Sequence, residues 1–123
     1  MNNQSIKYNL EDRTAVFAET AISLLKTIPI SPLNKRLIEQ CVGAAGSLGA
    51  NYCEANEAES KKDFIHKIGI CKKETKEVMH WLRLLASSNP EVKDTLRKLW
   101  QEAHELLLIF SSISRTSRKS KVK

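Results

Sequence analysis

The chain has 123 residues, which is enough for one domain with its own apolar core. Four glycines, three prolines and 6% aromatic residues leave few helix breakers and few strand formers, so the composition favours an all-helical domain over a β-sandwich or β-barrel. The net charge is +6, but five unopposed basic residues lie among residues 115–123, so the rest of the chain is nearly neutral.

Cysteine usage and the distribution of apolar residues argue against several classes of protein. The three cysteines, Cys41, Cys53 and Cys71, are odd in number and lack C-x-x-C spacing, so the sequence indicates neither a disulfide framework nor a zinc site. All three lie on predicted helical faces, as is typical of buried thiols. No segment matches a signal peptide, and no apolar run approaches the ~20 residues that span a membrane. We therefore expect a cytoplasmic protein.

The first helix is expected from about Glu11 to Thr27, because Glu11 and Asp12 would then lie in its first turn, where the helix dipole favours acids. Its apolar face repeats with helical spacing and consists of Thr14, Phe17, Ala21, Leu24 and Ile28. Ser31 followed by Pro32 predicts the N-cap and first position of a second helix.

The second helix has two neighbouring stripes. The apolar stripe consists of Leu37, Cys41, Ala44, Leu48, Tyr52 and Ala55. The other has mostly small residues: Ile38, Val42, Ala45, Gly49 and Cys53, with Gly46 and Ala50 close by. Glycine inside a helix costs ~1 kcal/mol relative to alanine unless close backbone approach offsets that cost. We therefore expect other helices to cover this helix on two sides.

A third helix is expected to follow a connection of two residues, because Ser60 and Asp63 form a pair similar to a capping box. Its apolar seam repeats over roughly 28 residues and consists of Phe64, Ile68, Cys71, Thr75, Val78, Leu82 and Leu85. Asn89 predicts the N-cap of a fourth helix, with Pro90 at its first position. The seam of the fourth helix consists of Val92, Leu96, Leu99, Ala103, Leu106, Phe110 and Ile113.

Four amphipathic helices with short connections predict an all-α, up-down-up-down four-helix bundle over residues 1–114. Each apolar stripe can be buried only against the others, which is why a bundle is expected. Residues 115–123 have no apolar period, and we expect a basic, disordered tail there.

Two segments, SLGANYCEA and SKKDFIHKIGICKKETKEVMHWLRLL, closely resemble the four-helix-bundle proteins encoded by intervening sequences in bacterial 23S ribosomal RNA genes. The likeness covers about residues 10–110 and extends distantly to the accessory protein of diversity-generating retroelements. The resemblance implies a left-handed bundle that assembles as a ring-like homopentamer. In the accessory protein, the basic surface of the ring engages nucleic acid and reverse transcriptase. The resemblance supplies no catalytic residue.

A basic stripe lies opposite the apolar seam of the third helix, because its members repeat with the same spacing. It consists of Lys62, His66, Gly69, Lys73, Lys76, His80 and Arg83, and Lys72 borders it. Acids are absent from the stripe itself, although Glu77 flanks it. The stripe is suited to following a phosphate backbone, or it is simply a solvated helix face.

The candidate nucleic-acid-binding residues combine this stripe with the tail. They are Lys62, His66, Lys72, Lys73, Lys76, Arg83, Arg115, Arg118, Lys119 and Lys121. The tail either binds phosphates without sequence preference or only adds solubility. Aromatic residues do not interleave either stretch, so the sequence predicts contact with the backbone of RNA or DNA and gives no support for base stacking.

Apolar residues outside the core seams predict contacts between subunits. They are Ile70, Trp81, Trp100, Leu107 and Leu108. The alternative is that the tryptophans only cover the edges of a single bundle.

Other chemistry is poorly supported. Glu77 and His80 match the Glu-x-x-His unit of di-metal bundles, but a second unit is missing because Glu102 and His104 have the wrong spacing. Cys41 lies on an apolar seam away from any evident base, as does Cys71, and the 46–49 segment lacks the Lys-Ser/Thr of a phosphate loop. We expect no metal, cofactor, small-molecule substrate or catalytic residue.

The sequence therefore predicts a non-enzymatic homo-oligomer that presents basic surface to RNA or DNA. The alternatives are a protein–protein interaction scaffold with no nucleic-acid role and, third, a bundle metalloenzyme.

Overall fold

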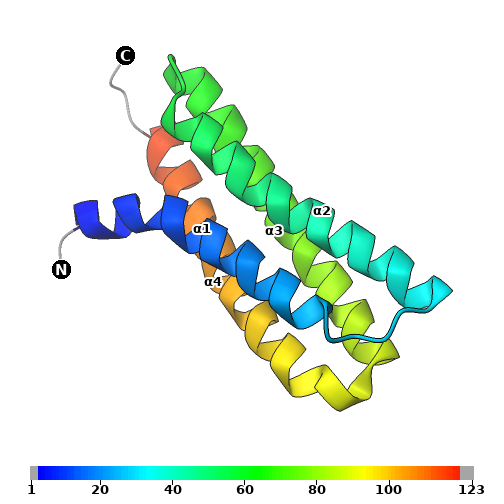
Figure 1. Ribbon diagram of the computed structural model, residues 1–123. Coiled ribbons are helices and arrows are strands. Elements are labelled where there is room, and N and C mark those ends of the chain that lie inside the picture. The colour runs from blue at the N-terminus through cyan, green and yellow to red at the C-terminus, as the bar shows by residue number, and fades with distance from the viewer. Residues whose placement is uncertain (1–2, 120–123) are drawn as a thin grey trace.

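The computed structural model describes residues 3–119, with side chains from Asn9 onward, and this part of the chain is almost entirely helical. Figure 1 shows helices α1 to α4, and a short 3₁₀ helix, η1, precedes α4. They are α1 (Asn3–Leu25), α2 (Pro32–Asn56), α3 (Lys61–Ser88), η1 (Pro90–Val92) and α4 (Lys93–Lys119). There is no strand between residues 3 and 119, so the predicted all-α fold with four helices is confirmed.

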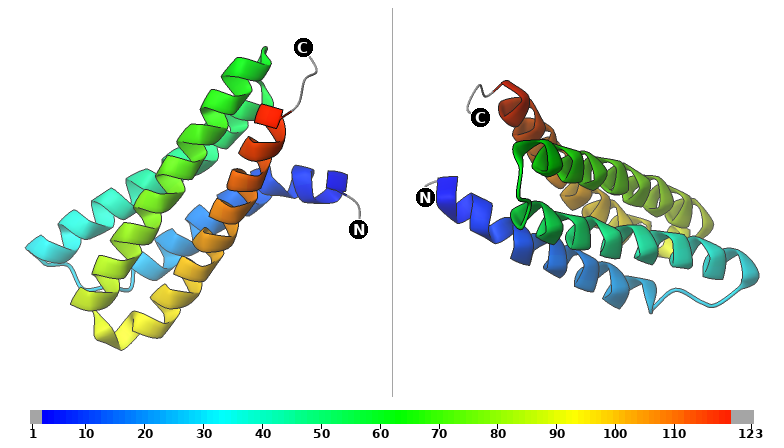
Figure 2. Two further views of the ribbon diagram at one scale, coloured as in Figure 1. Left: turned by 180° about the vertical axis from the view of Figure 1, so that it is seen from behind. Right: turned by 90° about the horizontal axis from the view of Figure 1, so that it is seen from above.

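Helix α3 is the central element of the arrangement, because it packs against α2 on one side and against α4 on the other (Figure 1). Helix α1 packs mainly against α2 and contacts α4 less extensively. The first turns of α1 project away from the other helices (Figure 2). None of the described helices has an apolar stretch long enough to cross a membrane.

The core follows the apolar seams that the periodicity predicts. Every predicted seam residue of α2 is buried, as is every one of α3 except the partly buried Phe64. In α4 the central seam residues are buried, whereas Ile113 and the predicted first seam residue Val92, which lies in η1, are partly buried. The rings of Tyr52 and Phe110 lie 5.8 Å apart at a tilt of 50°, which links α2 to α4 across the core.

Serine side chains cap the N-termini of α2 and α3, as predicted. Ser31 Oγ accepts a hydrogen bond from the backbone N–H of Asn34 at 3.0 Å, and Pro32 follows at the first helical position. Ser60 Oγ accepts one from the N–H of Asp63, also at 3.0 Å. Each hydroxyl satisfies a backbone donor that the first helical turn leaves unpaired.

Asn89 occupies the N-cap position of η1, which leads into α4, and Pro90 follows it as predicted. The Asn89 side chain makes no capping hydrogen bond, however, because this amide is paired with Asn34 instead. Asn34 Nδ2 donates to Asn89 Oδ1 at 3.0 Å, and Asn89 Nδ2 donates back to Asn34 Oδ1 at 2.9 Å. The two side chains are only 6% and 3% exposed. Asn34 also donates to Pro29 O, and Ser88 Oγ donates to Asn34 Oδ1. This buried network joins the start of α2 to the end of α3.

Helix α1 begins at Asn3, eight residues before the predicted start, so Glu11 and Asp12 lie inside the helix and not in its first turn. Residues 3–10 contain neither glycine nor proline, and nothing in them stops the helix from extending toward the N-terminus. Leu10 and Leu25 are buried, whereas the predicted Leu24 is only partly buried.

Helix α4 continues to Lys119. Residues 115–119 are therefore helical, whereas the sequence predicted a disordered tail that begins at residue 115. Arg118 and Lys119 occupy its last turn, where the helix dipole favours cations. Arg118 Nε also donates to Ser114 Oγ at 3.3 Å, one turn earlier. Lys121 lies outside the described residues.

The stripe of small residues on α2 is covered only in part. A Cβ atom built at Gly49 would lie 3.5 Å from Thr14 Oγ1, which shows that α1 approaches α2 closely there. A Cβ atom at Gly43 or Gly46 would meet nothing within 4 Å, and both glycines are exposed. Cys53 is also exposed, so the prediction that all three cysteines are buried is wrong for this one. The stripe is therefore covered in part: Ala45 is buried and Gly49 faces α1, whereas Gly46, Ala50 and Cys53 are exposed.

Candidate nucleic-acid interface

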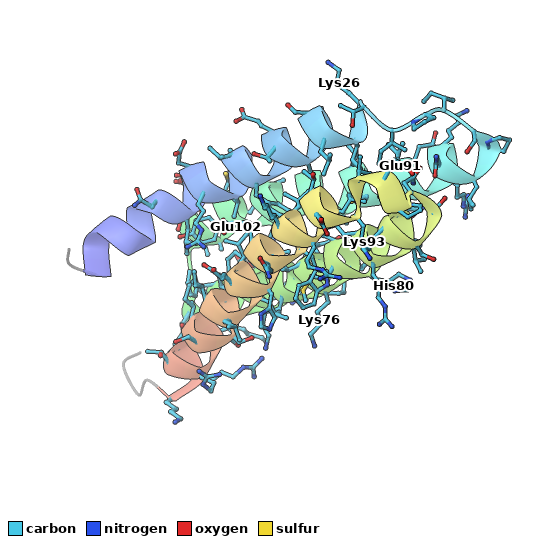
Figure 3. The ribbon with its side chains drawn as sticks, turned by 90° about the horizontal axis from the view of Figure 1, so that it is seen from below. Lys26, Lys76, His80, Glu91, Lys93 and Glu102 are labelled. Atoms are coloured by element: carbon cyan, nitrogen blue, oxygen red, sulfur yellow. The ribbon has the colours of Figure 1, made fainter. Side chains whose placement is uncertain are left out.

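The basic stripe lies on the outer face of α3. Its charged members project into solvent because the apolar seam on the opposite face of the helix fills the core. Figure 3 shows Lys76 and His80 pointing away from the bundle. The exposed members are Lys62, His66, Lys73, Lys76, His80 and Arg83, and the bordering Lys72 is partly buried.

The cations of the stripe have no ion-pair partner in the described part of the chain, although the exposed Glu77 flanks them. Among residues 9–119, whose side chains the structure describes, the four lysines of the stripe and its border (62, 72, 73 and 76) form no ion pair, and neither does Arg83. Lys67 lies outside the stripe and does have a partner, since its Nζ is 2.6 Å from Glu54 Oε1 on α2. Helical spacing places Glu74 on the same flank as Lys67, toward α2 and away from the stripe.

A groove between α3 and α4 extends the basic surface beyond α3. It has a volume of about 560 Å³. Its lining residues are Leu82, Arg83, Ala86, Ser87, Lys93, Leu96, Arg97, Trp100 and Gln101. Arg83, the last member of the stripe, thus meets two cations and one indole from α4. The sequence indicated no aromatic residue within the basic stretches, but the fold places Trp100 beside them.

The indole of Trp100 is held in a defined orientation. Its ring stacks on that of His104, with centroids 5.3 Å apart and planes 14° apart. His104 is one turn toward the C-terminus, whereas the groove residues Lys93 and Arg97 lie toward the N-terminus. The indole therefore lies between the imidazole and the groove. The sequence did contain a signal for this arrangement of Trp100 with the cations and His104, because residues 93, 97, 100 and 104 are spaced to share one helical face.

The predicted tail cations belong mainly to the end of α4. Arg115, Arg118 and Lys119 are exposed side chains of its last turns, so they are fixed to the helix and do not form a flexible segment. Helical spacing from His104 places Arg115 and Arg118 on the same side of α4 as Trp100. The basic surface therefore covers both α3 and the adjoining side of α4.

Two acidic residues of α4, Glu102 and Glu105, lie on its opposite side and contact α1. Arg13 forms a two-point contact with Glu102, with Nε–Oε2 at 2.7 Å and Nη2–Oε1 at 3.0 Å, and its Nη2 is 2.9 Å from Glu105 Oε1. The hydrogen bonds that Arg13 donates to Glu102 hold the pKa of Arg13 above its ordinary value. Figure 3 shows Glu102 on the α1 side of α4, away from Lys76. Sequence reasoning did not identify this cluster.

The predicted subunit-contact residues fall into two separate groups. Ile70 and Trp81 are partly buried on the flank of α3 that faces α2. Trp100, Leu107 and the 56% exposed Leu108 lie on α4. The structure therefore does not join them into one patch. The Trp81 ring meets His80 edge-on at 4.9 Å, and its buried Nε1 has no acceptor among the described residues.

The two buried thiols and the metal-ligating residue types were candidates for other chemistry. Burial raises the pKa of Cys41 and of Cys71 to about 12, so both thiols are protonated and unreactive near neutral pH. Glu77 and His80 are both exposed. Residues 3–119 contain no group of three or more histidine, cysteine or acidic side chains arranged to hold a metal ion.

Comparison with known proteins identifies the family. Residues 7–112 match the family described as 23S rRNA-intervening sequence protein. The chain belongs to this family. The resemblance that the two sequence segments indicated is thus confirmed, whereas the distant likeness to the retroelement accessory protein stays a prediction.

Structural comparison agrees with membership of the 23S rRNA-intervening sequence family. One similar crystal structure is that of a protein of unknown function from the S23 ribosomal protein family of Bacteroides thetaiotaomicron. It is 26% identical, with a TM-score of 0.77, over 89% of this chain and 97% of that one. No curated protein matches the chain.

Proposed function

We propose that this intervening-sequence protein is a non-enzymatic, homo-oligomeric bundle that binds RNA or DNA through backbone phosphates. The observation that carries the proposal is the unpaired basic stripe of α3. The chain has 14 acidic residues, yet the described ones leave the stripe without an ion pair. Fixed, unneutralised cations on one face form a surface of the kind that releases counterions from a phosphate backbone.

The length of the stripe fits this role. The 22 positions from Lys62 to Arg83 lie within one uninterrupted helix, and at 1.5 Å per residue they extend over about 32 Å. A nucleic-acid strand has one phosphate every ~3.4 Å, so a backbone along the stripe would pass each of its cations. Such contacts position a strand without reading its bases.

We also propose that the bundle has an up-down-up-down, left-handed topology and assembles as a ring-like homopentamer. The resemblance to intervening-sequence proteins supports this assembly, as does the apolar side chain of Leu108, which is 56% exposed. A ring would repeat the basic surface in every subunit and multiply the phosphate contacts. Oligomer size follows from light scattering, and a single 13.9 kDa species would contradict the proposal.

An interaction scaffold without nucleic acid is the second candidate. Ile30 is 80% exposed and Leu33 is 60% exposed, and both lie near the connection between α1 and α2. Neighbouring exposed apolar side chains of this size are typical of protein-binding surfaces. In this case the basic stripe would be a solvated face.

The two candidates are separated by salt-dependent binding of labelled RNA, single-stranded DNA and duplex DNA. Lys73→Ala with Lys76→Ala should weaken all binding and reduce the slope of log affinity against log salt by ~0.7–0.9 for each phosphate that is no longer neutralised. A matched control is Lys26→Ala with Lys35→Ala, outside the stripe, because Figure 3 shows Lys26 on the opposite side of the bundle from Lys76. Binding equal in both variants would remove the stripe from the mechanism. No salt-dependent binding at low salt would favour the scaffold.

A further inference from the structure

The groove between α3 and α4 combines two features that phosphate binding alone does not require. One is a cavity of about 560 Å³, which is within the size range of sites for small ligands. The other is an indole, that of Trp100, in the wall of a groove whose charged lining residues are all cations. A solvated helix face needs neither a cavity nor an aromatic wall.

The charges around the groove favour an anionic occupant. Arg83, Lys93 and Arg97 line it, and among residues 3–119 none of them forms an ion pair. No carboxylate lines the groove; Glu91 and Asp94 are close in sequence but are not part of its wall. Arg13 holds Glu102 and Glu105 on the far side of α4. The charged lining residues therefore favour an anionic group such as phosphate, beside an apolar wall.

The orientation of Trp100 favours a planar group on its groove side. The stacked His104 ring holds the indole from the C-terminal side of the helix, and the groove begins on the N-terminal side. A nucleobase is a planar group that is covalently linked to phosphates, so one nucleotide would satisfy both the indole and the cations. The bases of a duplex are stacked inside the helix and cannot reach a side chain in this way.

We infer that the groove binds an unpaired nucleotide of a single-stranded nucleic acid, with the base on Trp100 and the adjoining phosphates on Arg83, Lys93 and Arg97. This inference rests on the proposed function and adds a preference for single strands. The strand enters the groove from the basic stripe, because Arg83 belongs to both.

The test compares three labelled probes of equal length, about 12 nucleotides: a single strand, an abasic strand and a duplex, measured by fluorescence anisotropy. The intact protein should bind the single strand most tightly. Trp100→Leu should lower affinity for that strand roughly 5- to 150-fold, which is the range for removal of one stacked base. Affinity for the abasic strand and the salt slope should not change. Trp100→Phe should restore most of the affinity, because it keeps an aromatic face.

The remaining outcomes decide between this inference and the proposed function. Equal binding of all three probes, unchanged by Trp100→Leu, would overturn the inference and leave phosphate binding by the stripe intact. Absence of binding to any probe at low salt would overturn both. If Trp100→Leu changed the oligomer mass and weakened the abasic strand as much as the single strand, the groove would be a subunit contact, which also overturns the inference. Circular dichroism verifies that each variant is folded.

Discussion

The two sides of helix α4 differ in whether the nearby cations form ion pairs within the chain. Each side holds a groove, of about 660 Å³ toward α1 and about 560 Å³ toward α3. On the α1 side, Arg13 is bound to Glu102 and Glu105. On the α3 side, Arg83, Lys93 and Arg97 have no ion-pair partner in the described chain. On the α1 side Arg13 is therefore paired within the chain, although Lys98, which lines the same groove, forms no ion pair with the described side chains. On the α3 side, none of the three lining cations is paired in this way.

This difference follows from how extensively each pair of helices is packed. Of the four α-helices, α1 packs least extensively against the others, so directional ion pairs with α4 help to hold it in place. Helices α3 and α4 are already joined by extensive apolar packing along their seams. Their cations are therefore not needed for cohesion and are available for binding.

The largest expected effect concerns the buried amide network that joins the start of α2 to the end of α3. Asn34→Ala should lower the free energy of unfolding by about 2–3 kcal/mol, because Asn89 and Ser88 would lose their side-chain partner inside the protein. Denaturant unfolding measures the decrease. The double change Asn34→Ala with Asn89→Ala should cost less than the sum of the single changes. Strictly additive effects would show that the two amides do not act as a unit.

The close approach of α1 to α2 gives the next effect. Gly49→Leu should destabilise by roughly 1–3 kcal/mol, because the larger side chain would push against Thr14 on α1. The matched control is Gly46→Leu, on the same helix, where a Cβ meets nothing within 4 Å. That control should be neutral or slightly stabilising. Equal melting temperatures for the two variants would mean that α1 does not rest on Gly49.

The difference between the two sides is tested by making the same change on both sides of α4. Arg13→Met should lower stability by about 1 kcal/mol, a value reduced by solvent screening because the pair is partly exposed. Arg97→Met, on the α3 side, should leave stability within ~0.5 kcal/mol of the parent. Arg97→Met should weaken nucleic-acid binding, whereas Arg13→Met should leave it nearly unchanged. If Arg97→Met is as destabilising as Arg13→Met, both sides of α4 serve cohesion.

The smallest expected effect is a difference in thiol reactivity, which reports on the burial of the cysteines in the core. At pH 8, iodoacetamide should modify the exposed Cys53 and spare Cys41 and Cys71, whose pKa values burial raises to about 12. Mass spectrometry counts the adducts, and labelling of all three cysteines in the folded protein would contradict the burial.

The same raised pKa values make the fold sensitive to alkali. The unfolded thiols lose their protons near pH 9, whereas the buried ones hold them to about 12. The stabilisation is therefore fully present below pH ~9 and is lost as the pH rises toward 12. Cys41→Ala, compared with Cys53→Ala, should make stability less dependent on pH in that window.

The sequence by itself determined the elements that depend on neighbours along the chain. The seams of α2, α3 and α4 follow from spacings of three and four residues, and Ser31 and Ser60 cap the residues directly after them. The quoted segments also identified the family. These features are local, so a single sequence contains the information that specifies them.

Only the tertiary structure decided which helical faces meet. Asn34 pairs with a residue 55 positions away, and Arg13 with one 89 positions away. Trp100 likewise meets the basic stripe only because α4 packs on that side of α3. Helical periodicity says which face of each helix points inward, but the flank of one helix and the flank of its neighbour are brought together by packing in three dimensions. The candidate binding groove is formed by two such flanks, one on α3 and one on α4, so the sequence alone could not predict it.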